Sequence, residues 1–176
     1  MKQSPVLSSP RLLLRPMEEE DAEQVYRWAH SKAVTQYLFY LPNRTIEDTR
    51  RLVKKWVRKR RNYEWVLTKG GDVFGEIQVV KDLPGGGFEI GYESREDCWG
   101  NGYMSEALRM VLNFLFTEGG YSFGYAVTRK ENLRSQNLLK KLGFRETGEC
   151  LRHIEKTGED LTLVEFRLDP MSSGNP

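Results

Sequence analysis

The segment from Phe88 to Leu115 constrains the fold more than any other part of the chain. Residues 88–94 have the composition of a strand, and a turn containing Gly100 and Gly102 follows. After Gly102, apolar residues recur every three or four positions, which is the period of an amphipathic helix. The unpaired N–H groups at such a helix start, together with the helix dipole, favour an anion. The segment therefore predicts either a pyrophosphate site or an ordinary strand-to-helix turn.

Other phosphate, nucleophile and metal motifs are absent from the sequence. The chain has no Gly-x4-Gly-Lys-Ser/Thr loop, and Ser105 stands where the dinucleotide fingerprint needs its third glycine. It also lacks a Gly-x-Ser-x-Gly elbow and a His-Glu-x-x-His helix. Two histidines are too few for a typical metal cluster, and Cys98 and Cys150 lack zinc-site spacing. We therefore expect no metal site.

Strand-like and helix-like periods alternate along the rest of the chain. Strands are expected at 12–15, 63–68, 73–81, 88–94, 122–128, 144–153 and 161–168. Helices are expected around 22–29, from Thr45 onward, after Gly102, and at 135–142, with Thr45 and Asp48 forming a capping box. This order predicts an α/β (α+β) domain, in which helices flank a mixed, mostly antiparallel sheet of about seven strands.

The length and the termini predict one soluble domain. The chain has 176 residues, which suits a single domain over 1–176. We expect an ordered core at about 8–169 and a flexible polar tail at 170–176. The N-terminus lacks the apolar run of a signal peptide, and no stretch approaches the ~18 apolar residues of a membrane span. We therefore expect a cytoplasmic protein without a membrane partner.

The charges nearly cancel in total but are unevenly distributed. The 27 basic and 25 acidic residues give a net charge of +2, which argues against a strong uniform field. Residues 50–61 nevertheless carry eight positive charges. This segment is either a solvated helix face or a patch that contacts ribosomal RNA or an acidic protein surface.

A second segment, Asn132 to Phe144, combines with the first into a recognisable pattern. The chain resembles the GNAT N-acetyltransferase superfamily, and within it the RimJ/RimL-like ribosomal-protein alanine acetyltransferases. The resemblance covers nearly the whole chain and rests on these pieces: Arg11-Leu-Leu-Leu-Arg-Pro16, Asp21-Ala22, Glu89-Ile-Gly-Tyr92, Trp99-Gly-x-Gly-Tyr103, Asn132-x-x-Ser135 and Leu142-Gly-Phe144. It implies the GNAT acyl-CoA N-acyltransferase fold, with acetyl-CoA as co-substrate and no metal.

The resemblance also assigns the phosphate-binding residues. The family pattern Gln/Arg-x-x-Gly-x-Gly/Ala maps onto Trp99 to Met104, with Gly102 as the matching glycine. Trp99 at the first position is common in this subgroup, whereas Met104 stands where glycine or alanine is commoner. The pyrophosphate is expected on the backbone N–H groups of Gly100, Asn101, Gly102, Tyr103 and Met104, with the hydroxyl of Ser105 nearby.

The remaining coenzyme contacts follow from the same resemblance. The backbone of Ile90, Gly91 and Tyr92 is expected to pair with the pantetheine arm like an added strand. Asn132 is expected to bond the arm from the far side, and Lys141 to meet the nucleotide end.

Acetyl transfer from a thioester requires a neutral amine and a proton for the leaving thiolate. Glu89 could take the proton of the amine, directly or through water, or it could be a substrate-binding or structural carboxylate. The resemblance implies that Ser135 protonates the thiolate, and the alternative is a residue that only caps a helix. Tyr92 and Tyr125 are further candidates.

The sequence thus predicts direct transfer of an acetyl group from acetyl-CoA to a primary amine, such as a protein N-terminus, in a ternary complex. An alternative acceptor is a polyamine or an aminoglycoside, which an acidic acceptor pocket would favour. A silent CoA-binding or RNA-associated module is a third alternative, although Glu89, Asn132 and Ser135 are all present. A homodimer also stays open, because the resembled subgroup often forms one.

Overall fold

The computed structural model describes residues 2–58 and 62–170. Its strands are β1 (Leu7–Ser8), β2 (Leu13–Arg15), β3 (Glu64–Lys69), β4 (Asp72–Leu83), β5 (Gly87–Ser94), β6 (Phe123–Arg129), β7 (Arg145–Ile154) and β8 (Glu159–Leu168). Its helices are α1 (Ala22–Ala29), α2 (Lys32–Thr35), α3 (Ile46–Arg58), α4 (Tyr103–Thr117) and α5 (Leu133–Lys141), with 3-10 turns η1 (Glu19–Asp21) and η2 (Glu96–Cys98).

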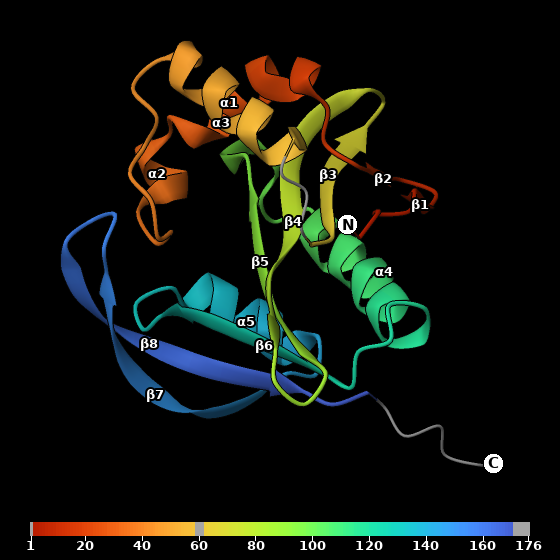
Figure 1. The fold of residues 1–176 in the computed structure, drawn as a ribbon, viewed down its shortest axis with the longest axis vertical. Helices are drawn as coiled ribbons and strands as arrows, with labels where there is room; N and C mark the ends of the chain where they lie inside the picture. The colour runs from red at the N-terminus through yellow and green to blue at the C-terminus, as the bar shows by residue number, and fades with distance from the viewer. Residues whose placement is uncertain (1, 59–61, 171–176) are drawn as a thin grey trace.

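The strands form one mixed sheet in the order β1-β2-β3-β4-β5-β6-β8-β7 (Figure 1). Only the β5–β6 pair is parallel, and the other neighbours are antiparallel. The predicted fold class is therefore confirmed, with eight strands in place of about seven. The additional strand is β1, which pairs with β2 through Leu7 and Leu14. Two residues are too few to show an alternating pattern in the sequence.

Helix α2 was not predicted from the sequence. Helix α5 begins at Leu133, two residues before the expected start. Four residues cannot show a helical period, so α2 is visible only through its N-cap Ser31, whose side chain accepts the N–H of Val34. In α5 the N-cap is Asn132, which places Ser135 inside the first turn.

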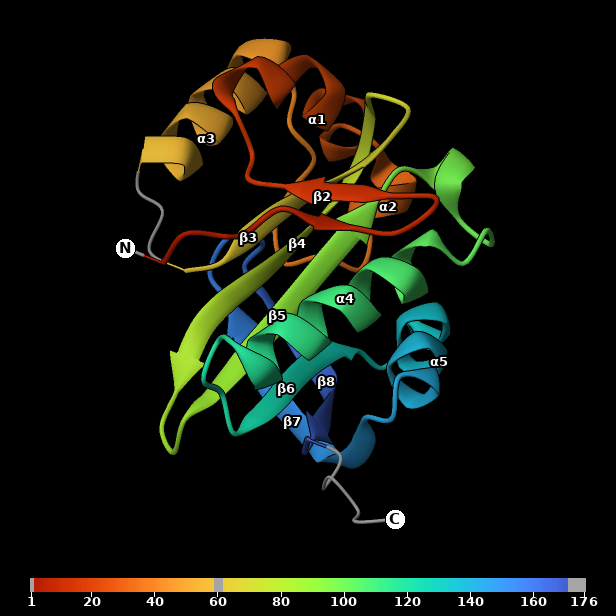
Figure 2. The same ribbon diagram turned by 90° about the vertical axis from the view of Figure 1, so that its right-hand side faces the viewer.

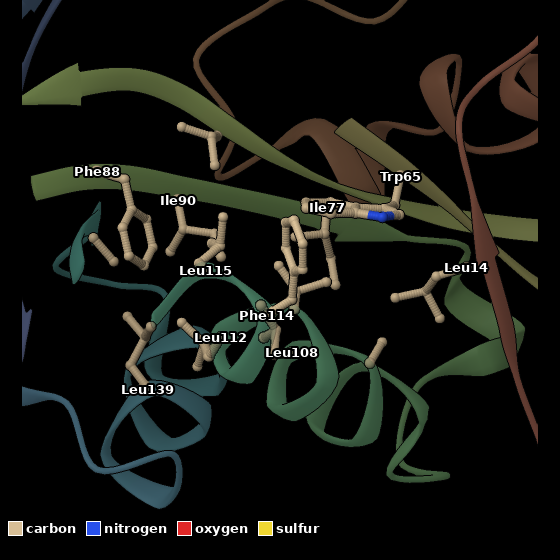
Figure 3. Packing of buried hydrophobic residues seen from close by; sticks show 14 of the residues in the cluster. Leu14, Trp65, Ile77, Phe88, Ile90, Leu108, Leu112, Phe114, Leu115 and Leu139 are labelled. Atoms are coloured by element: carbon tan, nitrogen blue, oxygen red, sulfur yellow. The ribbon is translucent and has the colours of Figure 1, made fainter. Parts of the chain in front are cut away.

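Helices cover both faces of the sheet. Helices α4 and α5 lie on one face and α1 to α3 on the other (Figures 1 and 2). Leu108, Val111 and Leu115 of α4 pack against Ile77 and Phe88 of the sheet in the larger core (Figure 3). A smaller core packs side chains of α1, α2 and α3 on the opposite face.

Alternation along β4 and β5 distributes side chains between these two faces. Ile77 and Ile90 belong to the α4 core, so their neighbours of opposite parity point the other way. Glu76 and Glu93 are directly paired across the β4–β5 ladder, and both lie on the face covered by α1 to α3.

The parallel strands β5 and β6 pair over only three residues. Gly87, Phe88 and Glu89 match Phe123, Gly124 and Tyr125, and the described ladder ends there. The start of the pair is tightly packed, because a Cβ on Gly87 would lie 2.2 Å from the ring of Phe123. From Ile90 onward, β5 therefore offers backbone groups to an opening between the strands.

The basic segment begins as predicted. The N–H of Thr45 donates to Oδ2 of Asp48 at 3.0 Å, and the N–H of Asp48 donates to Oγ1 of Thr45 at 3.2 Å, which confirms the capping box. Helix α3 then lies against α1, as Figure 1 shows.

Much of the positive charge of α3 is paired within the molecule. Arg50 pairs with Glu23 of α1, Arg58 pairs with Glu19 at 3.4 Å, and Arg51 pairs with Asp48 at 2.5 Å. Residues 59–61 of the basic segment lie outside the described residues, as do Met1 and residues 171–176 of the predicted tail. No helix in the described ranges is both long and apolar enough to cross a bilayer.

Candidate active site

A glycine turn leads from β5 and η2 into α4. Gly102 is the N-cap of α4 and has a φ of 76°, a left-handed conformation that side chains other than glycine rarely adopt. Gly100 has a φ of 78°, and a Cβ there would meet no atom within 4 Å. A Cβ on Gly102 would lie 3.8 Å from the guanidinium of Arg11. The backbone of Gly100 is thus unobstructed next to the first N–H groups of α4, which is a geometry that binds an anion.

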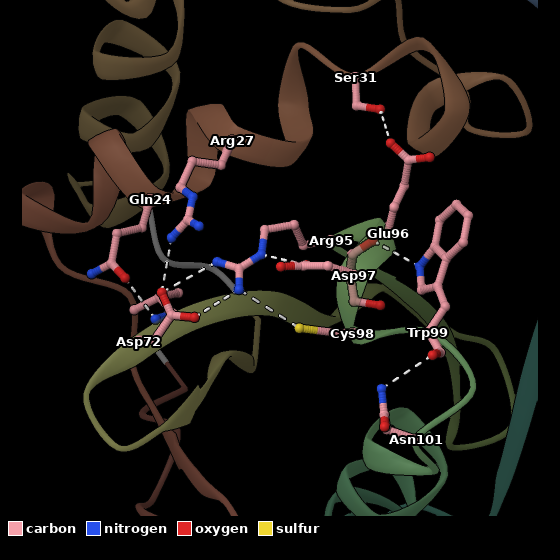
Figure 4. Close-up of polar contacts among 12 residues, drawn as sticks. Gln24, Arg27, Ser31, Asp72, Arg95, Glu96, Asp97, Cys98, Trp99 and Asn101 are labelled. Carbon is pink, nitrogen blue, oxygen red and sulfur yellow. Dashed lines mark hydrogen bonds and ion pairs between the residues drawn. The ribbon is translucent and has the colours of Figure 1, made fainter.

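A network of ion pairs holds the segment before the glycine turn (Figure 4). Arg95 pairs with Asp72 at 2.7 Å and with Asp97 at 2.6 Å, and Arg27 adds a bond to Asp72 at 2.9 Å. The Arg95 guanidinium holds the pKa of Asp72 and of Asp97 below the usual range. These contacts connect the segment to the β3–β4 hairpin and to α1.

Arg11 fixes the turn from its other side. Its guanidinium donates to the carbonyl of Asn101 at 3.2 Å and pairs with Glu106 in the first turn of α4. Asn101 itself donates from Nδ2 to the carbonyl of Trp99 at 3.2 Å (Figure 4). The sequence analysis did not identify Arg11 as a positioning residue, because it lies 90 residues from the turn.

The glycine turn forms one wall of a cavity of about 630 Å³. The other walls come from the end of β5, the start of α5, α2 and the segment after α2. The predicted coenzyme residues that line it are Tyr92, Trp99, Gly100, Gly102, Tyr103, Met104, Ser105, Asn132, Ser135 and Lys141. Glu89, Ile90, Gly91 and Asn101 are not among its lining residues.

Two hydroxyl groups meet on the wall of this cavity. The Tyr92 hydroxyl lies 2.8 Å from Oγ of Ser135. Ser135 is held in the first turn of α5, where its N–H donates to Oδ1 of Asn132 at 3.1 Å. Burial raises the pKa of Tyr92 to about 12, so its phenol stays protonated at neutral pH. The pair can therefore deliver a proton to a group bound between β5 and α5.

Trp99 occupies the corner between the glycine turn and α5. Its Nε1 donates to the carbonyl of Ser94 at 3.0 Å, and the guanidinium of Arg134 lies 3.9 Å from the ring centroid. Arg134 and Lys141, both exposed on α5, give this corner a positive charge that suits an anionic ligand. Arg134 was missed because the resemblance attached no role to that position.

Glu89 is buried on β5, on the face opposite α4. Its carboxylate lies 3.0 Å from Nζ of Lys81 and 3.9 Å from Arg152. The side chain is 5% exposed. Two cations thus lie beside a nearly buried carboxylate.

Glu93 is a carboxylate of the cavity wall that no motif indicated. It belongs to the same strand face as Glu89, four residues further along β5. Its Oε1 accepts hydrogen bonds from Nε1 of Trp28 at 2.8 Å and from the hydroxyl of Tyr40 at 2.7 Å. Burial raises the pKa of Glu93, and burial together with the charge of Glu93 also raises that of Tyr40.

Glu76 stands directly beside Glu93 on β4. It is 4% exposed, and its Oε2 has no hydrogen-bond partner within the described residues. Burial, followed by repulsion from Glu93 and Glu64, raises the pKa of Glu76 well above its usual value. Two acidic side chains thus lie side by side, and neither forms an ion pair with Lys or Arg within residues 2–58 and 62–170.

Comparison with known families identifies this architecture. Residues 11–145 match the family model described as "Acetyltransferase (GNAT) domain". The chain belongs to the GNAT acetyltransferase family. GNAT enzymes use acetyl-CoA as co-substrate, so the chain is an acetyl-CoA-dependent N-acetyltransferase at the level of its family.

Individual GNAT relatives differ in what they are named for. "Uncharacterized N-acetyltransferase YoaA" of Bacillus subtilis (strain 168) is 28% identical over 168 residues, covering 88% of this chain and 90% of that protein. "Spermidine N(1)-acetyltransferase" of Escherichia coli (strain K12) is 23% identical over 161 residues, covering 86% and 82%. A crystal structure from Salmonella typhimurium, of an acetyl transferase that modifies the N-terminal serine of ribosomal protein L7/L12, has a TM-score of 0.82 at 17% identity, covering 94% and 99%.

These matches confirm the GNAT domain and its fold but leave the RimJ/RimL subgroup a prediction. The glycine turn fits the pyrophosphate of a coenzyme, because the left-handed glycines leave space where side chains would stand. No group of three or more His, Cys, Asp or Glu able to hold a metal occurs in the described part of the chain.

Proposed function

We propose that this GNAT enzyme transfers the acetyl group of acetyl-CoA directly to a primary amine in a ternary complex. One observation carries the proposal. The Tyr92–Ser135 hydroxyl pair and the glycine turn before α4 line the same cavity, so an acid and an anion cradle share one site. This arrangement suits a long ligand with a phosphate at one end and a leaving thiol at the other.

The coenzyme is proposed to lie along this cavity. The pyrophosphate would meet the backbone N–H groups of residues 100–104 and the hydroxyl of Ser105, with Lys141 and Trp99 beside it. The pantetheine arm would pair with the backbone of residues 90–92, where β6 no longer accompanies β5. Asn132 would hold the arm from α5, since the bond from Ser135 to its Oδ1 orients its Nδ2 as a donor.

The proposed chemistry moves two protons from the acceptor. Glu89 is proposed to take the first proton from the ammonium, directly or through water, and its carboxylate pairs with Lys81 and Arg152. The neutral amine then attacks the carbonyl carbon, a C–N bond forms, and the C–S bond breaks. Ser135 donates its proton to the thiolate and recovers one from the attacking nitrogen through solvent, while Tyr92 holds the hydroxyl in place.

Two acceptor classes remain candidates. A protein N-terminus follows from the sequence prediction, and the Salmonella structure is named for that activity. A small cationic amine is favoured by Glu93, which lines the cavity on the face of β5 covered by α1 to α3 (the acceptor side), next to Glu76 of β4, because a carboxylate attracts positive charge. The spermidine-named relative acts on such an amine.

Three further sequence predictions stay proposals. We propose a cytoplasmic protein that can form a homodimer, which sedimentation of the purified chain would test. We also propose that residues 50–61 contact ribosomal RNA, although Arg50, Arg51 and Arg58 already pair with carboxylates. RNA binding would weaken steeply with added salt, and salt-insensitive or absent binding would exclude this role.

Release of free thiol from acetyl-CoA tests the proposed function. The purified chain is incubated with peptides bearing free N-termini, with polyamines and with aminoglycosides. We expect thiol release with at least one class. Coenzyme binding without release in any class would instead indicate a silent CoA-binding module.

A further inference from the structure

The carboxylates on the acceptor side of β5, Glu93 and Glu76, indicate a specific class of acceptor and not only a general preference for cations. We propose that Glu93, backed by Glu76, is a binding site for a second ammonium group of the acceptor, so that the enzyme prefers diamines and polyamines over monoamines and peptide N-termini. This inference rests on the proposed function and names the substrate class of the same site.

Glu93 lies next to the coenzyme side of β5 but faces the opposite way. Tyr92 and Glu93 are consecutive residues of a strand, so their side chains leave β5 on opposite faces. Tyr92 meets Ser135 on the coenzyme side. Glu93 lines the same cavity on the side of α2 and Tyr40. An amine that reaches a thioester beside Ser135 from the α2 side therefore passes within reach of Glu93.

Glu93 lacks the balancing charge that other buried carboxylates have. Asp21 has Arg15 beside it, and Glu89 has Lys81. Among the described residues, Glu93 has two neutral donors, Trp28 and Tyr40, and no cation. Glu76 is 4% exposed, with a buried Oε2 that accepts no hydrogen bond in ranges 2–58 and 62–170.

Such a pair is costly unless it holds a proton or a cation. In the free protein, a proton bound to the pair reduces this cost, which agrees with the raised pKa values of Glu76 and Glu93. At Glu93, an ammonium group can replace that proton, because it brings one positive charge and three N–H donors to a carboxylate of the cavity wall that has no cation among the described residues. Trp28 and Tyr40 meanwhile fix Oε1 of Glu93, so the carboxylate keeps its orientation when the ligand arrives.

Glu89 and Glu93 have different surroundings along β5. Glu89 has its own cations and lies away from the cavity lining. Glu93 lines the cavity without a charged partner in the described residues. The first is suited to act as the base, and the second to bind a cation. Loss of Glu89 should therefore lower kcat, whereas loss of Glu93 should raise KM for acceptors that carry a second charge.

The experiment compares two amines of equal length on the full chain. Butylamine and 1,4-diaminobutane share four carbons and differ in the second ammonium. We expect kcat/KM for the diamine to exceed that for the monoamine by at least about tenfold, because a desolvated ion pair contributes more than a solvated one. In Glu93→Gln the ratio should fall to about one to two, mainly through the KM of the diamine. Glu118→Gln, an exposed site at the end of α4, should keep the wild-type ratio.

A second variant keeps the test valid if Glu93→Gln does not fold. Glu76→Gln removes one of two buried carboxylates that repel each other, so it should fold at least as stably as the parent protein. It should also lower the diamine preference. In addition, titration calorimetry of 1,4-diaminobutane in buffers of different ionisation enthalpy should show release of a proton, and this release should vanish in Glu76→Gln.

Three results would overturn the inference. They are a wild-type ratio near one, a ratio that folded Glu93→Gln and Glu76→Gln leave unchanged, and turnover of uncharged-side-chain peptides with neither amine accepted. In each case thiol release would still support the proposed function. Absence of thiol release with all amines and peptides would instead refute the proposed function, and the inference with it.

Discussion

The two sides of β5 are constructed in different ways. On the coenzyme side, the groups proposed to bind acetyl-CoA come from three short contiguous segments, residues 90–92, 99–105 and 132–141. On the acceptor side, Trp28, Tyr40, Glu76 and Glu93 come from three separate elements and a loop. A ligand shared by a whole family can be bound by a local motif, whereas a ligand that varies is recognised by dispersed side chains.

The largest effect should come from the glycine turn on the coenzyme side. Gly102→Val forces a β-branched residue to a φ of 76° at the N-cap of α4, so it distorts the turn whose N–H groups are proposed to bind the pyrophosphate. We expect the Kd for CoA to rise by at least about 100-fold, measured by calorimetry.

Gly120→Val is the matched control for that substitution. Gly120 has a φ of 75° and lies just beyond the opposite end of α4, so the backbone strain is equal and the coenzyme is far away. Both variants should lose similar thermal stability, and Gly120→Val should bind CoA normally. Normal CoA affinity in Gly102→Val would refute the placement of the pyrophosphate.

Ser135→Ala should separate turnover from coenzyme binding. The Asn132 cap bonds the backbone N–H of residue 135, so the helix start survives the substitution. We expect kcat to fall by about 100-fold, the usual contribution of a positioned general acid. The Kd for CoA should change little. Tyr92→Phe should show a smaller fall in kcat, and an unchanged kcat in Ser135→Ala would remove Ser135 from the mechanism.

The acceptor side should respond to pH in a defined direction. The raised pKa values of Glu76 and Glu93 mean that the pair keeps its protons to a higher pH than ordinary carboxyl groups, and a bound ammonium is proposed to displace them. The KM for 1,4-diaminobutane should therefore fall as pH rises through the titration of the pair, above the usual carboxyl range. Steady-state kinetics of the parent and of Glu93→Gln would show this, and an equal slope in both would contradict it.

Folding stability should fall as pH rises, whereas binding of 1,4-diaminobutane should become stronger. A carboxyl whose pKa is higher in the folded state favours folding while both states are protonated, and this contribution is lost as pH rises through the folded pKa. Glu76→Gln should thus stabilise the protein by about 1–2 kcal/mol at pH 8 and by less at pH 5. Denaturant unfolding at the two values measures the difference. Equal stabilisation at both would mean that Glu76 does not titrate.

The smallest effect is expected at the clamp behind the glycine turn. Arg11→Gln removes the bond to the carbonyl of Asn101 and the pair with Glu106. We expect the Kd for CoA to rise by about threefold to tenfold, because half-exposed ion pairs contribute modestly. Arg145→Gln, which breaks an exposed pair with Asp169, should leave it unchanged. Equal CoA affinity in both variants would show that Arg11 does not position the turn.

The contrast between local motifs and dispersed side chains also explains which features the sequence could predict. The order of long elements and the glycine turn were predicted correctly, because periodicity and left-handed glycines are local properties. Strand β1 and helix α2 were missed because both are too short for a period. Glu93 was missed because its neighbours Trp28 and Tyr40 lie more than 50 residues away along the chain.

The predicted catalytic base, Glu89, shows most clearly what the sequence alone does not reveal. Glu89 stands in the family pattern, but only the structure shows its pairing with Lys81 and its absence from the cavity wall. Alternation along β5 does place Glu89 and Glu93 on one face. It does not reveal which of them lacks a cation, since that depends on strands and loops distant in sequence.

One measurement tests the division of the site by β5 most directly. Thiol release is followed at saturating acetyl-CoA while 1,4-diaminobutane is varied, for the parent protein, Ser135→Ala and Glu93→Gln. The account predicts that Ser135→Ala lowers kcat with little change in KM, and that Glu93→Gln raises KM with a smaller change in kcat. If both variants lose kcat in parallel with KM unchanged, the two sides of β5 do not have separate roles.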